Sequence, residues 1–111
     1  MENVKGKVVL ITGAAMGLGR LFAEKAVAEG AEAVVLWDIN EEALVETADA
    51  LQAAGGRVYG YIVDVSSADE IEATAAIVRE EIGEIDILFN NAGIVRGNSY
   101  FWALDDVSQI Q

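Results

Sequence analysis

A glycine-rich stretch near the N-terminus constrains the fold of this chain more than any other feature. Residues 12–19 read Thr-Gly-Ala-Ala-Met-Gly-Leu-Gly, and they connect the apolar run 8–11 to an amphipathic segment. A glycine turn between a buried strand and a helix presents backbone N–H groups at the positive end of the helix dipole, where an anion is stabilised. We therefore predict a phosphate-binding turn, in which Gly13 allows the sharp bend, Gly17 the close approach of the phosphate, and Gly19 the packing of helix against strand.

The rest of the chain alternates apolar runs of strand length with amphipathic segments of helix length. We expect strands over 7–11, 33–38, 58–63 and 85–89. We expect helices over 17–29, from a cap at Asn40 to Gly55, from a capping-box spacing at 67–70 to Gly83, and from about residue 105 onward. The stretch between the fourth strand and residue 104 is expected to be irregular.

Strand–helix units of this length form parallel sheets through right-handed crossovers. The chain is therefore expected to be α/β, with a Rossmann-like doubly wound parallel sheet in the strand order 3-2-1-4. Four strands are slightly more than half of such a sheet, so we expect this fold to lack its C-terminal half. We expect residues 1–111 to form the N-terminal part of a single nucleotide-binding domain of this fold. The helices are expected to bury these apolar residues: Leu18, Leu21, Phe22 and Ala26; Leu44, Ala48 and Leu51; Ile71, Ala75, Val78 and Ile82.

Four candidate ligand positions, Gly13, Asp38, Asp64 and Asn91, fall just beyond the carboxyl ends of the expected strands. In an open parallel sheet these ends form one rim, where the ligand binds. Asp38 can accept hydrogen bonds from both hydroxyls of an adenosine ribose, and its charge would repel a 2′-phosphate. Nearby Met16, Ile39 and Asn40 supply no cation, which favours NAD(H) over NADP(H). The alternative is that Asp38 only ends a strand or caps a turn.

The other two strand ends fit the remainder of a dinucleotide. Asp64 can bond the adenine amino group while Val65 flanks the ring, although Asp64 can also be a turn aspartate beside Ser66. Residues 90–93 read Asn-Asn-Ala-Gly, and they can cross-link adjacent strands and pass close to a ribose, or form a plain Asn-rich turn. The predicted cofactor contacts are Gly13, Ala15, Met16, Gly17, Leu18, Gly19, Asp38, Ile39, Asp64, Val65, Asn91, Ala92 and Gly93.

Together the motifs at 12–19, 64–65 and 86–93 resemble the short-chain dehydrogenase/reductase family over essentially the whole chain. Residues 35–40, Val-Leu-Trp-Asp-Ile-Asn, are similar to the retinol and 17β-hydroxysteroid dehydrogenase branch. The resemblance implies hydride transfer between NAD(H) and a secondary alcohol or ketone, with a hydrophobic, retinoid- or steroid-like substrate. It also implies a catalytic tyrosine with a lysine four residues later, a serine and a relay asparagine.

None of those catalytic positions is expected within these residues. Tyr59, Tyr61 and Tyr100 have no lysine four residues on, so none of them matches the family tyrosine. We therefore expect the chain to carry the cofactor-binding half and to be inactive alone. The aromatic run 100–102 is either a substrate-side or subunit-contact patch, or packing for the missing half.

Composition narrows the class of protein further. The chain has no Cys and no His, which removes disulfides, Cys/His zinc sites, histidine bases and cysteine nucleophiles, and we predict no metal site. A net charge of −12 makes nucleic acid and anionic membrane surfaces poor partners. No apolar run is long enough for a membrane span, and the N-terminus does not resemble a signal peptide. We expect a cytoplasmic location and, for the complete protein, a homo-oligomer.

Two other classes of protein compete with this interpretation. One is a non-catalytic, free-standing nucleotide-binding or interaction module, which a Tyr-x-x-x-Lys sequence downstream of residue 111 would exclude. The other is a methyltransferase, which has the same alternation of strands and helices and also a glycine turn. The Gly-x-x-x-Gly-x-Gly spacing and the Asn-Asn-Ala-Gly sequence argue against it.

Overall fold

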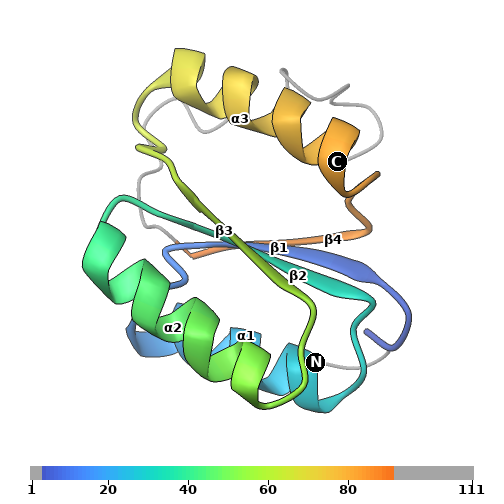
Figure 1. The fold of residues 1–111 in the computed structure, drawn as a ribbon. Coiled ribbons are helices and arrows are strands. Elements are labelled where there is room, and N and C mark those ends of the chain that lie inside the picture. The colour runs from blue at the N-terminus through green and yellow to red at the C-terminus, as the bar shows by residue number, and fades with distance from the viewer. Residues whose placement is uncertain (1–3, 92–111) are drawn as a thin grey trace.

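The computed structural model describes residues 4–91 and contains the expected alternation of strands and helices (Figure 1). The elements are β1 (Val8–Thr12), α1 (Gly17–Ala28), β2 (Ala33–Asp38), α2 (Glu41–Ala53), β3 (Val58–Ile62), α3 (Ala68–Glu81) and β4 (Ile87–Asn90). The helix expected from residue 105 and the aromatic run 100–102 lie outside the described residues.

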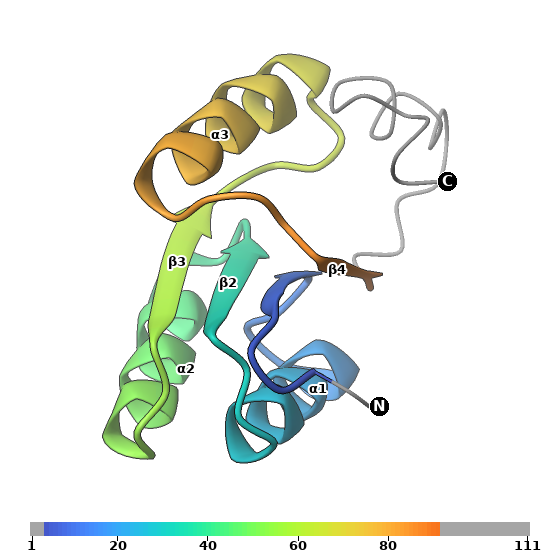
Figure 2. The ribbon, with the colours of Figure 1, turned by 90° about the vertical axis from the view of Figure 1, so that its right-hand side faces the viewer.

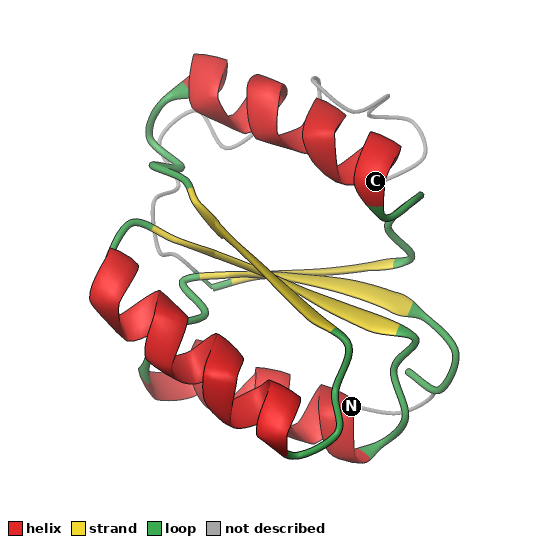
Figure 3. Cartoon of the chain, in the orientation of Figure 1, coloured by secondary structure: helices red, strands yellow, loops and turns green. Residues whose placement is uncertain are grey.

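The four strands form one parallel sheet in the order β3-β2-β1-β4, as the sequence predicts. Helices α1 and α2 cover one face of this sheet and α3 covers the other (Figures 1 and 2). Because both faces are covered, the strands carry apolar residues at successive positions rather than alternating with polar ones. Because all four strands are parallel, the loops that follow their carboxyl ends, drawn in green in Figure 3, lie at the same end of the sheet.

Strand register aligns the positions that matter for the site. Thr12 at the end of β1 pairs with Trp37 on one side and with Asn90 on the other. Asp38 at the end of β2 pairs with Ile62 of β3. All four strands therefore end at nearly the same level, and the residues that follow them meet at one rim.

Two hydrophobic clusters fill the spaces between the sheet and its helices. Alternate residues of β1 and β2 point to opposite faces, so both strands contribute to both clusters. The cluster under α1 and α2 includes Val9, Ile11, Val34, Leu36, Ala23, Ala26, Leu44 and Leu51. The cluster under α3 includes Leu10, Val35, Trp37, Val63, Ile71 and Val78.

The expected buried side of α1 is partly wrong. Leu18 and Leu21 are 61% and 53% exposed, whereas Gly19, Ala23 and Ala26 are buried and Phe22 is half-buried. The small residues lie at i, i+4 and i+7 and form the stripe that faces the sheet. The helix approaches so closely that a Cβ added at Gly19 would lie 2.1 Å from the carbonyl oxygen of Gly13. Large side chains are therefore excluded from this stripe.

The start of the fourth strand also differs from the expectation. Asp86 precedes β4, and its carboxylate accepts a hydrogen bond from the backbone N–H of Val8 at 2.8 Å. The backbone N–H of Asp86 donates to the carbonyl of Val8 at 2.9 Å. The carboxylate of Asp86 thus binds the first backbone N–H of β1, at the start of the β1–β4 pairing, and β4 begins at Ile87 rather than at Ile85.

Candidate functional site

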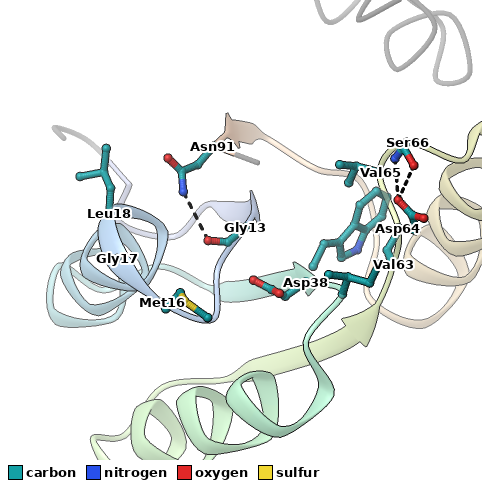
Figure 4. A pocket seen from close by; sticks show the side chains of 12 residues that line it. Gly13, Met16, Gly17, Leu18, Asp38, Val63, Asp64, Val65, Ser66 and Asn91 are labelled. Atoms are coloured by element: carbon teal, nitrogen blue, oxygen red, sulfur yellow. Dashed lines mark hydrogen bonds between the residues drawn. The ribbon is translucent and has the colours of Figure 1, made fainter. Parts of the chain in front are cut away.

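A pocket of about 600 Å³ opens at the carboxyl ends of the strands (Figure 4). Its lining comes from the glycine turn, the start of α1 and the segments that follow β2, β3 and β4. Among the described residues it is lined by Gly13, Met16, Gly17, Leu18, Trp37, Asp38, Ile39, Val63, Asp64, Val65, Ser66 and Asn91. The predicted residues Ala15 and Gly19 lie behind this surface, and Ala92 and Gly93 lie outside the described residues. Trp37, Val63 and Ser66 were not predicted.

The three glycines of the turn have different physical roles. Gly13 and Gly17 have φ angles of +64° and +63°, in the left-handed region that other residues rarely adopt. A Cβ added at Gly17 would meet nothing within 4 Å, so the missing side chain leaves open space in the pocket that Gly17 lines. Gly19 instead permits the contact between α1 and the turn described above.

The N-terminus of α1 is not capped by its own side chains, unlike those of α2 and α3. Its N-cap residue, Met16, makes no side-chain hydrogen bond to the helix, and its first turn carries no acidic residue. Asn40 and Ser67 cap the other two helices, and each of those helices has two acidic residues in its first turn. The end of α1 that faces the pocket therefore keeps its positive dipole uncompensated by carboxylates of its own first turn.

Asp38 lies between the glycine turn and the turn at Asp64 (Figure 4). One of its carboxylate oxygens accepts from the N–H of Ala15 and the other from the N–H of Asn40, both at 2.9 Å. A carboxylate can accept about four hydrogen bonds, so these two leave capacity for donors in the pocket. Asp38 thus holds the glycine turn and also presents a negative charge to any ligand.

Thr47 supports the site although sequence reasoning missed it. Its side chain is completely buried on α2, and its hydroxyl donates to the carbonyl oxygen of Ala15 at 2.8 Å. The spacing of apolar residues indicates that Thr47 is buried, because it lies three residues after Leu44 and four before Leu51 on the buried stripe of α2. A hydroxyl at such a position requires a partner.

The Asn-rich end of β4 cross-links adjacent strands, which was one of the two interpretations of residues 90–93. The hydroxyl of Thr12 donates to the side-chain oxygen of Asn90, and the backbone N–H of Asn91 donates to that hydroxyl, both at 2.9 Å. The side-chain amide of Asn91 donates to the carbonyl of Gly13 at 3.3 Å (Figure 4). These bonds tie the end of β4 to the glycine turn.

Asp64 makes the turn contacts that its alternative interpretation requires, and it also lines the pocket. One carboxylate oxygen accepts from the backbone N–H of Ser66 at 2.9 Å and from its hydroxyl at 2.6 Å. These two hydrogen bonds hold the pKa of Asp64 below its usual value, so the group is a charged acceptor at neutral pH.

The capping box expected at residues 67–70 is only half formed. The N–H of Glu70 donates to the hydroxyl of Ser67, but the carboxylate of Glu70 accepts from the N–H of Asp64 rather than from that of Ser67.

The two tyrosines of β3 do not line the pocket. Tyr59 accepts a hydrogen bond from Arg57 at 2.8 Å, and Tyr61 donates to the carboxylate of Glu81 at 2.8 Å. Burial, and then the bond to Glu81, raise the pKa of Tyr61 to about 12. Both hydroxyls are therefore engaged with neighbouring side chains away from the pocket.

Comparison with known proteins identifies the family. The model of the short chain dehydrogenase family matches residues 7–110, which shows that the chain belongs to this family. The chain is 45% identical over 109 residues to mouse epidermal retinol dehydrogenase 2, covering 97% of the chain and 35% of that protein. It is 43% identical over 104 residues to estradiol 17-beta-dehydrogenase 11 of Macaca fascicularis, covering 94% of the chain and 34% of that protein.

Solved structures support the same fold. A short chain dehydrogenase/reductase from Burkholderia phymatum in complex with NAD superposes with a TM-score of 0.78 at 46% identity, over 85% of this chain and 33% of that one. Among other similar structures, a xylitol dehydrogenase is bound to NAD+, and L-sorbose reductase from Gluconobacter frateurii is complexed with NADPH and L-sorbose. The chain spans about a third of the length of the curated relatives it matches. In the described part of the chain, no helix combines the length and apolarity needed to cross a bilayer.

Proposed function

We propose that this chain is the cofactor-binding part of an NAD-dependent oxidoreductase. The observation that carries the proposal is the pocket itself. It combines open space at Gly17, where α1 begins, with the carboxylate of Asp38 in the same lining. A bound NAD supplies the site that accepts or returns a hydride. The described residues fit such a cofactor, because the turn is shaped for a diphosphate and Asp38 for a diol.

Each end of the pocket suits a different part of the dinucleotide. The N–H groups around Gly17 would hold the pyrophosphate, and Asp38 would accept from the hydroxyls of the adenosine ribose. Asp64 and Val65 would contact the adenine. Asn91, with Ala92 and Gly93 after it, would pass close to the second ribose.

NAD(H) is the preferred dinucleotide in this proposal. A 2′-phosphate would be placed beside the carboxylate of Asp38, and like charges at short range repel. Among the described residues that line the pocket, none is Lys or Arg. The two hydrophobic residues on either side, Met16 and Ile39, offer no compensating charge.

The reaction proposed for the complete protein is oxidation of a secondary alcohol or reduction of the matching ketone. Similarity to proteins named for retinol and for estradiol supports a hydrophobic, retinoid- or steroid-like substrate. Residues 1–111 would form the N-terminal part of one NAD(P)-binding domain and would be inactive alone, because they contain no tyrosine followed by lysine at the fourth position. A cytoplasmic location and a homo-oligomer complete the proposal.

Substitution of Asp38 tests the cofactor assignment. Asp38→Ala removes the ribose acceptor and the partner of the Ala15 N–H, so NAD affinity should fall about tenfold or more, since a charge-assisted hydrogen bond contributes about 1.5–3 kcal/mol. NADP affinity should fall less. Calorimetric titration of the gene product with both dinucleotides measures this.

Asp49→Ala is the matched control, because it removes the same charge from an exposed position of α2 outside the pocket. Its NAD affinity should equal that of the parent. Tighter binding of NADP than of NAD by the parent protein would contradict the proposed cofactor preference.

A further inference from the structure

The peptide units on both sides of Ala15 are held by side chains from outside the glycine turn. The N–H of Ala15 donates to Asp38 at 2.9 Å, and its carbonyl oxygen accepts from Thr47 at 2.8 Å. Ala15 is 2% exposed and Thr47 is 0% exposed, so water does not compete for the carbonyl. The two bonds together fix the φ and ψ angles of this residue.

These bonds belong to a closed ring. Asp38 also accepts from the N–H of Asn40, and the side chain of Asn40 accepts from the N–H of Ala43 at the start of α2. Thr47 lies on the same helix, one turn further on. The ring therefore runs from Asp38 to Ala15, to Thr47, and back along α2 to Asn40.

We infer that Thr47 is a positioning residue for dinucleotide binding, an inference that rests on the proposed function. The carbonyl of Ala15 and the N–H of Met16 belong to one trans peptide, so they point in opposite directions. When Thr47 holds the carbonyl toward α2, the N–H of Met16 points away from α2, and Met16 is one of the residues that line the pocket. Thr47 thus sets the direction of a donor at the proposed pyrophosphate site without touching the ligand.

The hydroxyl, rather than the bulk of the side chain, carries this role. A threonine hydroxyl has one hydrogen to donate, and in a helix it often donates to a carbonyl of the preceding turn. The hydroxyl of Thr47 instead donates to Ala15, 32 residues away in the sequence. Serine supplies the same hydroxyl without the methyl group, and alanine supplies neither.

The test compares Thr47→Ser with Thr47→Ala in the full gene product, because the two variants differ by one oxygen atom. The serine variant should bind NAD as the parent does, and the alanine variant should bind about tenfold more weakly, the effect of one hydrogen bond of ordinary strength. Leu51→Ala is the control for a general defect in α2. It removes a buried side chain one turn from Thr47, so it should lower stability and leave the NAD affinity of the folded protein unchanged.

A second measurement separates this inference from the proposed function. Hydrogen exchange of the Ala15 amide, followed without cofactor, should be faster in Thr47→Ala than in the parent and in Thr47→Ser. If the parent binds no dinucleotide, the proposed function fails, and this exchange rate alone decides whether Thr47 orders the turn. Equal exchange and equal NAD affinity in the serine and alanine variants would overturn the inference.

Discussion

At the residue scale, neighbouring glycines in one motif are required for different reasons. Gly19 is required by packing, because an added Cβ would overlap the backbone of Gly13. Gly17 combines a positive φ with open space on its side-chain face. Substitutions at these two positions should therefore have different consequences, with folding affected first at Gly19 and ligand binding at Gly17.

Gly17→Ala should abolish most NAD binding while the protein stays folded. The methyl group would occupy the space proposed for the pyrophosphate, and the left-handed backbone adds a cost of about 1–2 kcal/mol. Gly6→Ala is the matched control, because Gly6 also has a positive φ, +74°, and nothing within 4 Å of an added Cβ. Urea unfolding should show similar destabilisation for both variants.

Calorimetric titration then separates the two variants. Gly6→Ala should retain the parent's NAD affinity, and Gly17→Ala should lose at least tenfold. Equal affinities would mean that the phosphates bind elsewhere in the molecule.

At the element scale, the contact between β3 and α3 has a pH dependence that can be measured. Tyr61 donates to Glu81, and its pKa is raised from 10.0 to about 12. Above pH 10 the unfolded chain loses this proton while the folded chain keeps it, so the contribution of Tyr61 is complete below about pH 10 and is lost as pH rises toward about 12. The stability of the protein should fall across this window.

Tyr61→Phe isolates the effect, because it removes the titrating hydroxyl and keeps the ring. Urea unfolding of both proteins at about pH 9 and about pH 11.5 should show a difference in stability that shrinks at the higher pH. A difference that is constant across these pH values would show that Tyr61 ionises equally in the folded and unfolded chains.

Also at this scale, strands were easier to predict than helix faces. The apolar runs predicted the strands correctly, because a parallel strand that is buried on both faces is a nearly continuous run of apolar residues. In α1 the apolar residues Leu18, Leu21 and Phe22 suggested one buried side, whereas the true contact stripe consists of Gly19, Ala23 and Ala26. Hydrophobicity cannot reveal how closely a helix approaches its sheet. The role of Thr47 was missed because its partner is a backbone carbonyl 32 residues away.

At the scale of the whole molecule, β4 is an edge within the described residues. Its single neighbour there is β1, and its residues Ile87, Leu88 and Phe89 are apolar and only partly buried. Phe89 stacks on Phe22 of α1, with ring centroids 3.9 Å apart. An apolar strand edge with unpaired backbone groups tends to pair with another chain.

We therefore expect the 111-residue chain alone to be poorly stable or to self-associate. The net charge of −12 opposes association at long range, but backbone pairing acts at short range. Sedimentation at several protein concentrations, together with thermal unfolding, tests this expectation. A cooperatively melting monomer at high concentration would contradict it and would favour the free-standing module over an enzyme part.

The sequence positions of the sheet partners also have a consequence for synthesis of the chain on the ribosome. Thr12 of β1 and Asn90 of β4 are bonded neighbours in the sheet but are 78 residues apart in the sequence. At about 5–20 residues per second, translation of that interval takes roughly 4–16 s. Throughout this time β1, one of the two interior strands, lacks its β4 neighbour, so one edge of β1 stays open even after β2 has been made. The nascent chain therefore presents Val9, Leu10 and Ile11 to chaperones or to neighbouring nascent chains before its own β4 has been made.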